Sequence, residues 1–147
     1  MITAIAAVAN GGYLVQPHVV DRMLDSDGNI VKTTDTSYKR QVISEDVSKR
    51  MTAILQKNAT SESGKNGYVA GYRVAGKTGT AERADENGGY LKENYMSSFM
   101  GFAPAQSPKV LCYITLDGTP SGSDAAAVPF QSIMANALDV LGIPRTR

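Results

Sequence analysis

The sequence of 147 residues predicts an α+β fold in which antiparallel strands pack against helices. Two stretches, 44–59 and 125–141, carry apolar residues at helical spacing. Between them lie three short segments rich in the apolar and β-branched residues that favour strands. The last two of these segments are joined by about five residues, Pro104 to Pro108, which is most simply an antiparallel connection.

The first forty residues predict the last turns of a helix and then a β-hairpin. Residues 3–10 are rich in Ala and Ile and stop at Asn10-Gly11, a pair suited to a left-handed helix C-cap. Residues 25–29, Asp-Ser-Asp-Gly-Asn, form a strong turn signal. Because this turn lies between the apolar pairs Met23-Leu24 and Ile30-Val31, we expect an antiparallel hairpin.

A second helix is predicted from 44 to 59. Ser44 is a good N-cap, and the carboxylates of Glu45 and Asp46 suit the first turn because they interact favourably with the helix dipole. The apolar residues that follow at helical spacing are Val47, Met51, Ile54 and Leu55. The polar, glycine-containing run 60–67 after this helix is expected to be a surface loop.

The second half of the sequence predicts three strands and a helix. The strands are expected at 69–81, 95–103 and 109–116. The polar run 83–93 is expected to be a loop, and we interpret it as a flap at the edge of a cleft, to which Gly88-Gly89 adds freedom. The final helix, 125–141, should end at Gly142, with Pro144 just beyond it.

Composition excludes several classes of function. Fifteen Lys and Arg against fourteen Asp and Glu give a net charge of +1, so nothing points to a nucleic acid or to a strongly charged partner. Cys112 is the only cysteine, and its apolar strand context favours a small packing residue. No stretch approaches the ~18 apolar residues of a membrane span. The acidic residues show no spacing typical of a metal site, and no cofactor is expected.

The most informative run is 74–82, Val-Ala-Gly-Lys-Thr-Gly-Thr-Ala-Glu, and two interpretations compete for it. Gly71 to Thr78 satisfies the phosphate-loop pattern G-x-x-x-x-G-K-[ST], and Asp117 after an apolar strand imitates the metal-binding aspartate of a nucleotide hydrolase. A phosphate loop must open directly into a helix. Residues 83–89 have no apolar period and two adjacent glycines, so the context argues against a nucleotide hydrolase.

The other interpretation is the K-T-G motif of penicillin-binding proteins and serine β-lactamases. The run Gly76-Lys77-Thr78-Gly79-Thr80-Ala81 is followed by a loop and then by Ser98-Phe99-Met100-Gly101-Phe102-Ala103-Pro104. Upstream, the run Thr3 to Gly12 and Pro17 are similar to the helix and strand that follow the second active-site motif of that family. In this ordered set the chain resembles, over nearly its whole length, the class B, high-molecular-weight penicillin-binding proteins. These are the monofunctional transpeptidases of division, elongation or sporulation.

The resemblance implies a partial penicillin-binding-protein or serine β-lactamase-like fold and roles for four residues. Lys77 would line the cleft as a catalytic residue, supplying positive potential near the nucleophile and the substrate carboxylate. The hydroxyls of Thr78 and Thr80 would hydrogen-bond that carboxylate, and the backbone N–H of Thr80 would form half of an oxyanion hole. Gly79 has no Cβ, so a substrate backbone can lie against the strand edge.

The nucleophile that this chemistry needs is missing from the sequence. The family uses a serine in S-x-x-K, whose lysine activates the hydroxyl, together with an S-x-N motif. Ser37 comes closest, but Arg40 stands where the lysine belongs, and arginine stays protonated at pH 7. No serine has an asparagine two residues later. We therefore expect residues 1–147 to be the C-terminal portion of one transpeptidase domain, inactive alone, with both motifs in a preceding portion.

The resemblance also implies what the whole protein does. It would cross-link the stem peptides of peptidoglycan through a serine acyl-enzyme and be acylated by β-lactams. It would sit on the outer face of the bacterial cytoplasmic membrane, anchored by an N-terminal helix. A serine β-lactamase or D,D-carboxypeptidase and a non-catalytic β-lactam sensor domain are the alternatives. Because the family's sheet takes further strands from the preceding portion, we predict an open edge and self-association or strand exchange.

Overall fold

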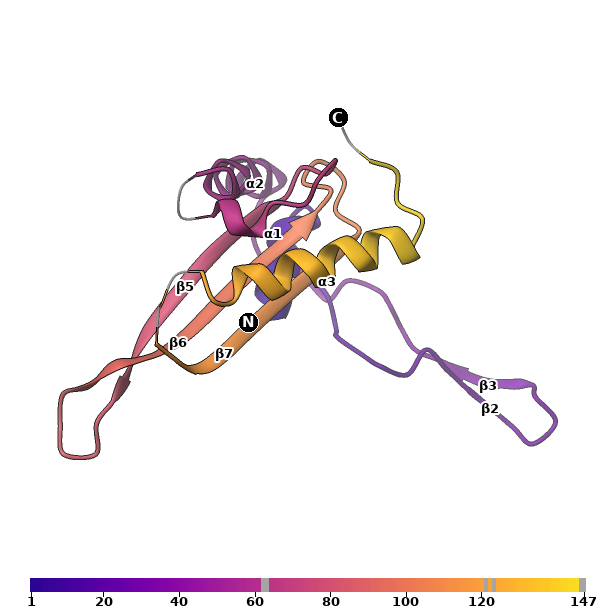
Figure 1. The fold of residues 1–147 in the computed structure, drawn as a ribbon. Coiled ribbons are helices and arrows are strands. Elements are labelled where there is room, and N and C mark those ends of the chain that lie inside the picture. Colours follow the sequence, from indigo (N-terminus) through magenta and orange to yellow (C-terminus); the bar gives the residue numbers. More distant parts are fainter. Residues whose placement is uncertain (62–63, 121, 123, 146–147) are drawn as a thin grey trace. The chain divides into compact units, whose positions relative to one another are not determined.

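The computed structural model describes residues 1–61, 64–120, 122 and 124–145 and confirms the α+β fold with antiparallel strand pairs. In chain order its elements are α1 (Ile2–Ala9), β1 (Tyr13–Leu14), β2 (Arg22–Leu24), β3 (Ile30–Thr33), β4 (Arg40–Gln41), α2 (Glu45–Ala59), the short 3-10 helix η1 (Lys65–Gly67), β5 (Ala75–Ala84), β6 (Tyr90–Ala103), β7 (Val110–Thr119) and α3 (Ala127–Val140) (Figure 1). The chain divides into two compact units, residues 1–49 and the residues from Arg50 onward.

The first unit contains α1 and a small sheet that its C-cap prepares. Gly11 has a φ of 86°, and the N–H of Gly12 donates to the carbonyl of Ala7 at 2.8 Å, so the predicted left-handed cap is confirmed. A Cβ on Gly12 would lie 1.9 Å from the carbonyl oxygen of Ile43, so this approach requires glycine. Strand β1 then pairs with β4. Sequence patterns did not reveal this pair, because two residues show no readable alternation.

Strands β2 and β3 form the predicted hairpin, which the side chain of Asp25 organises. One carboxylate oxygen of Asp25 accepts the backbone N–H groups of Asp27 at 3.0 Å and Asn29 at 2.8 Å. The Asn29 backbone and side-chain donors hold the pKa of Asp25 below its ordinary value. Every residue of both strands is exposed, so the turn sets the register here without help from a core.

Helix α2 begins where the sequence predicts. The Oγ of Ser44 accepts the N–H of Val47 at 3.3 Å, which confirms the expected N-cap. One turn apart, Lys49 Nζ lies 2.7 Å from Glu45 Oε1. The run 60–67 was predicted to be a surface loop, but part of it forms η1 and part of it is buried.

Two glycines of that run are buried, and residues 62–63 lie outside the described part. Gly64 precedes η1 and Gly67 ends it. A Cβ on Gly67 would lie 2.4 Å from Cζ of Phe99, so the glycine backbone packs directly on the aromatic ring. In the sequence these glycines indicate a loop, whereas in the fold they permit close packing.

The second unit is built on an antiparallel sheet in the order β5-β6-β7. The three predicted strands are present, but β5 begins at Ala75, and β5 and β6 both continue into the predicted loop 83–93. The connection between them is only 85–89, where Gly88 and Gly89 both have positive φ. The β5–β6 ladder continues from the packed sheet to the pair Ala84 and Tyr90, so cross-strand hydrogen bonds hold the polar residues that suggested a loop.

One face of this sheet is covered by α3 (Figure 1). Phe99 of β6 and Phe130 of α3 are fully buried, with ring centroids 4.4 Å apart. A Cβ on Gly101 would lie 2.8 Å from Phe130, so glycine lets the helix approach the sheet. Gly142, with a φ of 61°, follows the helix as predicted. The buried core comprises Ala59, Val69, Tyr72, Val74, Phe99, Ala103, Ala126, Ala127, Phe130, Met134 and Leu138.

Candidate functional site

The Lys-Thr-Gly-Thr run lies within β5 and presents its side chains alternately to the two faces of the sheet. Thr78 is paired with Phe99, and Thr80 is paired with Ser97. Directly paired residues share a face, so both threonines lie on the face that carries Phe99 and α3. Lys77 and Gly79 therefore lie on the opposite face.

Strand β5 is at the edge of its sheet. Its inner edge pairs with β6, and within the described ranges no strand pairs with its outer edge. An edge of this kind presents a row of backbone N–H and C=O groups to which an extended chain can add as a further strand. The run predicted to bind substrate therefore lies where an extended peptide can dock.

The ammonium group of Lys77 stays at the surface of this strand. Its Nζ donates to the carbonyl oxygen of Thr78 at 2.8 Å and lies 3.3 Å from Thr78 Oγ1. Lys77 is exposed, whereas Thr78 is half-buried. The positive charge and the Thr78 hydroxyl are thus held together, an arrangement suited to a carboxylate.

The neighbouring strand β6 leaves little room for a side chain at position 79. It is paired with Ser98, and a Cβ on Gly79 would lie 2.5 Å from Ser98 Oγ. The sequence interpretation assigned this glycine to substrate approach alone. The serine hydroxyl is a second reason for glycine, which only the register reveals.

Two residues beside Thr80 were not identified from the sequence as part of the site. Ser97, directly across from Thr80, is fully buried and donates from Oγ to the carbonyl oxygen of Gly122 at 2.6 Å. A Cβ on Gly122 would lie 2.3 Å from Thr80 Cγ2. No local pattern marks this contact, since Ser97 and Gly122 are 25 residues apart in the chain.

Beyond Thr80 the two strands form an open hollow of about 490 Å3. It is lined by Glu82, Tyr90, Leu91, Lys92, Glu93 and Tyr95. The next residue along β5, Arg83, places Nε 3.4 Å from Asp117 Oδ1 in an exposed ion pair. Asp117 is the residue that imitated a metal-binding aspartate, and here it pairs with an arginine.

The phosphate-loop interpretation is excluded by this geometry. Gly76, Lys77 and Thr78 are consecutive residues inside β5. A phosphate loop would place the lysine and threonine at the N-terminus of a helix, whose amides bind the phosphates. The strand instead continues for six residues after Thr78, to Ala84.

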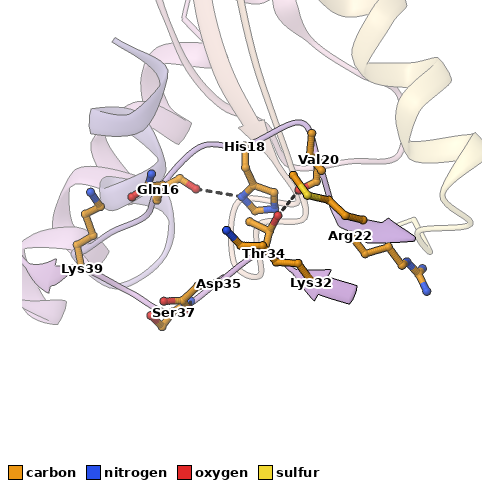
Figure 2. Close-up of a pocket in the computed structure, with 10 residues that line it drawn as sticks. Gln16, His18, Val20, Arg22, Lys32, Thr34, Asp35, Ser37 and Lys39 are labelled. Carbon is orange, nitrogen blue, oxygen red and sulfur yellow. Dashed lines mark hydrogen bonds between the residues drawn. The ribbon is translucent and has the colours of Figure 1, made fainter. Parts of the chain in front are cut away.

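A second cavity, of about 360 Å3, lies in the first unit (Figure 2). His18 projects into the group of residues drawn there, and its Nδ1 lies 3.1 Å from the carbonyl oxygen of Gln16. Thr34 donates its hydroxyl to the carbonyl of Val20. The lining residues are Gln16, His18, Val20, Arg22, Met23, Lys32, Thr34, Asp35, Ser37 and Lys39.

This cavity contains Ser37, the serine that most nearly fits S-x-x-K, and its direct hydrogen-bond partner there is Asp35. The backbone N–H of Ser37 donates to Asp35 Oδ1 at 2.9 Å. The Ser37 backbone and side-chain donors lower the pKa of Asp35, which makes this carboxylate a weaker base than usual. Asp35 is therefore a poor candidate for a base that would activate Ser37.

The described ranges contain no cluster of three or more His, Cys, Asp or Glu side chains placed to hold a metal. None of the helices in them is both long and apolar enough to cross a bilayer. Burial raises the pKa of the Cys112 thiol above its ordinary value of 9.0. Its side chain packs against the core around Phe99 and Phe130, as expected for a packing residue.

Comparison with known proteins agrees with this geometry. The family model "Penicillin binding protein transpeptidase domain" matches residues 1–135. Stage V sporulation protein D of Bacillus subtilis is 37% identical over 147 residues, which cover 97% of this chain and 23% of that protein. The probable peptidoglycan D,D-transpeptidase PenA of Neisseria gonorrhoeae is 40% identical over 88 residues, covering 57% of this chain and 15% of that protein. The chain spans about a quarter or less of the length of these curated relatives.

Solved structures show the same fold. The D,D-transpeptidase domain of a peptidoglycan glycosyltransferase from Eggerthella lenta superposes with a TM-score of 0.85 at 27% identity, over 97% of this chain and 32% of that one. Penicillin binding protein 3 of Mycobacterium tuberculosis, complexed with ampicillin, superposes with a TM-score of 0.84 at 25% identity. That match covers 99% of this chain and 35% of the other.

Proposed function

Because the chain belongs to the penicillin binding protein transpeptidase domain family, we propose that it supplies the substrate-binding strand of a peptidoglycan D,D-transpeptidase. We assign residues 1–147 to the C-terminal portion of one transpeptidase domain. The serine nucleophile and its activating lysine belong to another portion of that domain, since the sequence contains neither S-x-x-K nor S-x-N. Acyl transfer then needs both portions.

The observation that carries the proposal is the position of Lys77-Thr78-Gly79-Thr80 on a strand whose outer edge is open. A stem peptide lies extended along this edge and adds to the sheet as a further strand. The hydroxyls of Thr78 and Thr80 hydrogen-bond its terminal carboxylate, and the charge of Lys77 lies close to Thr78. The exposed edge, the shared face of the threonines and the position of Lys77 all support these roles.

The reaction is acyl transfer through a serine ester. The serine oxygen attacks the peptide carbonyl, and the tetrahedral intermediate carries its negative charge on the carbonyl oxygen. The backbone N–H of Thr80 donates to that oxygen as half of the oxyanion hole. Collapse of the intermediate expels the terminal amino acid, and the amine of a second stem peptide then attacks the ester and releases the serine.

β-Lactams bind to the same strand in this proposal. Penicillin binding protein 3 of Mycobacterium tuberculosis was solved with ampicillin and with aztreonam. Ampicillin carries a carboxylate beside a strained amide, so the groups that bind the peptide terminus also suit the drug. The whole protein acts on the outer face of the cytoplasmic membrane, where its peptidoglycan substrate lies. The names of relatives favour a D,D-transpeptidase over a β-lactamase or a sensor.

A chimaeric protein tests this proposal. Residues 1–147 replace the matching third of Mycobacterium tuberculosis penicillin binding protein 3, and the chimaera is treated with fluorescent penicillin. We expect covalent labelling of the chimaera and no adduct on the isolated chain. Lys77→Ala should abolish labelling, whereas Lys57→Ala, which removes an exposed lysine from α2, should leave it unchanged. Undiminished labelling of the Lys77→Ala chimaera, or an adduct on the isolated chain, contradicts the proposal.

A further inference from the structure

A buried hydroxyl beside the substrate strand binds the backbone carbonyl of one residue far along the chain, Gly122. Ser97 of β6 is fully buried, and its Oγ donates to the carbonyl oxygen of Gly122 at 2.6 Å. A buried hydroxyl needs a partner, because one left without a hydrogen bond carries a desolvation cost. Ser97 satisfies that need by binding the carbonyl of Gly122. A second anchor lies close by, where Thr119 Oγ1 donates to the carbonyl of Tyr95 at 3.2 Å.

Gly122, the residue whose carbonyl Ser97 binds, lies against Thr80. A Cβ on Gly122 would lie 2.3 Å from Thr80 Cγ2 and 3.0 Å from Thr80 Oγ1. Only a residue without a Cβ fits at position 122 beside the Thr80 side chain. The side chain of Thr80 is therefore bounded on one side by Gly122.

We infer that Ser97 is a positioning residue for Thr80: by holding Gly122 against the Thr80 side chain, it keeps the Thr80 hydroxyl in one rotamer. An exposed threonine on a strand has more than one staggered χ1 well available. In the observed rotamer both Cγ2 and Oγ1 of Thr80 lie toward Gly122, so packing against the glycine backbone favours this well over those that would place only one of the two atoms there. The purpose of the fixed rotamer, which is to present the Thr80 hydroxyl to a carboxylate, rests on the proposed function. The fixed rotamer itself does not.

Replacing Ser97 with alanine should release this contact. The Gly122 carbonyl would lose its donor inside the protein and gain by turning toward water. Once Gly122 moves away, Thr80 can populate further χ1 wells. The ladder between β5 and β6 does not involve the Ser97 hydroxyl, so the pairing of Thr80 with residue 97 should persist.

Nuclear magnetic resonance of the isotope-labelled 147-residue chain tests the inference without any substrate. Three-bond couplings from Thr80 Cγ2 to its backbone nitrogen and carbonyl carbon report χ1 directly. We expect couplings of a single rotamer in the parent chain and averaged values in Ser97→Ala. The control Ser132→Ala removes the same hydroxyl from an exposed position on α3 and should change nothing. Single-rotamer couplings in a folded Ser97→Ala variant would overturn the inference.

A second variant covers the case in which Ser97→Ala does not fold. Gly122→Ala adds a Cβ at the point of contact, so we expect the Thr80 couplings to change; unchanged couplings there would also overturn the inference. In the chimaera, Ser97→Ala should slow acylation by about tenfold, the effect of one lost hydrogen bond. Ser132→Ala should not slow it. If the chimaera is not labelled by penicillin even without a substitution, the proposed function is contradicted. The Thr80 couplings of the isolated chain then still decide whether Ser97 positions Thr80.

Discussion

Gly79 and Ser98 lie directly opposite one another in the register of β5 and β6, and a Cβ on Gly79 would come within 2.5 Å of the serine oxygen. The glycine of the K-T-G run therefore has a neighbour within the sheet as well as a proposed ligand at its edge. These two constraints differ in strength. Ser98 can turn its hydroxyl to another rotamer, but a peptide backbone along the edge cannot move aside in the same way.

Gly79→Ala should therefore fold with nearly unchanged stability but bind poorly. We expect the free energy of unfolding in urea to change by less than about 1 kcal/mol, because the Ser98 hydroxyl can rotate and alanine suits a strand at least as well as glycine. Acylation of the chimaera by penicillin should fall by at least about tenfold if the added methyl keeps the ligand from the edge. A large loss of stability with normal acylation would assign this glycine to the sheet alone.

Gly67→Ala should behave in the opposite way. Its Cβ would lie 2.4 Å from the ring of Phe99, which is fully buried and cannot rotate away. Overpacking of this kind typically costs about 1–3 kcal/mol of unfolding free energy. Gly79→Ala serves as the matched control, since it makes the same chemical change beside a movable side chain. Equal stabilities of the two variants would show that the core around Phe99 is loosely packed.

The contact between Phe99 and Phe130 should dominate the stability of the second unit. Both rings are fully buried with centroids 4.4 Å apart, so either phenylalanine-to-alanine change should cost about 3–5 kcal/mol. A double-mutant cycle should give a coupling of about 0.5–1.5 kcal/mol. Val140→Ala, on an exposed residue of α3, should cost less than about 0.5 kcal/mol. Additive effects of the two ring deletions would contradict the packing described.

The thiol of Cys112 should be slow to react while the chain is folded. Burial raises its pKa above 9.0, so the thiolate fraction at pH 7.5 is smaller than for an exposed cysteine. Alkylation by iodoacetamide should accelerate when urea unfolds the chain. Because the folded pKa is the higher one, the contribution of this group to stability is present below pH 9.0 and is lost as pH rises through the folded value. Equal alkylation rates in the folded and unfolded chain would refute this.

The open edge of β5 should make the isolated chain self-associate. The sheet face opposite α3 adds exposed apolar area at Met96 and Tyr113. Sedimentation velocity should show a weight-average sedimentation coefficient that rises with protein concentration. Ala81→Lys, which places a charge on the edge strand, should reduce the rise, whereas Val140→Lys on α3 should not. A monodisperse monomer at every concentration would rule out association through this edge.

Local sequence patterns predicted the elements whose caps and turns depend on residues that lie close together in the chain. The Ser44 cap, the Asp25 turn and the Gly142 stop each depend on residues within a few positions, and each was predicted correctly. The extension of β5 to Ala84 and of β6 back to Tyr90 was not predicted, because cross-strand hydrogen bonds stabilise residues whose own composition favours a loop.

Residue types and spacings express directly the family, the order of the longer elements and the run Lys77 to Thr80 that carries the proposed chemistry. The open edge of this run and the contact of Thr80 with Gly122, which Ser97 holds, become visible only in the folded chain. Those features depend on strand register and on contacts between residues far apart in the chain. A shift of one residue in the register would turn the same side chains to opposite faces, so spacing alone cannot specify them.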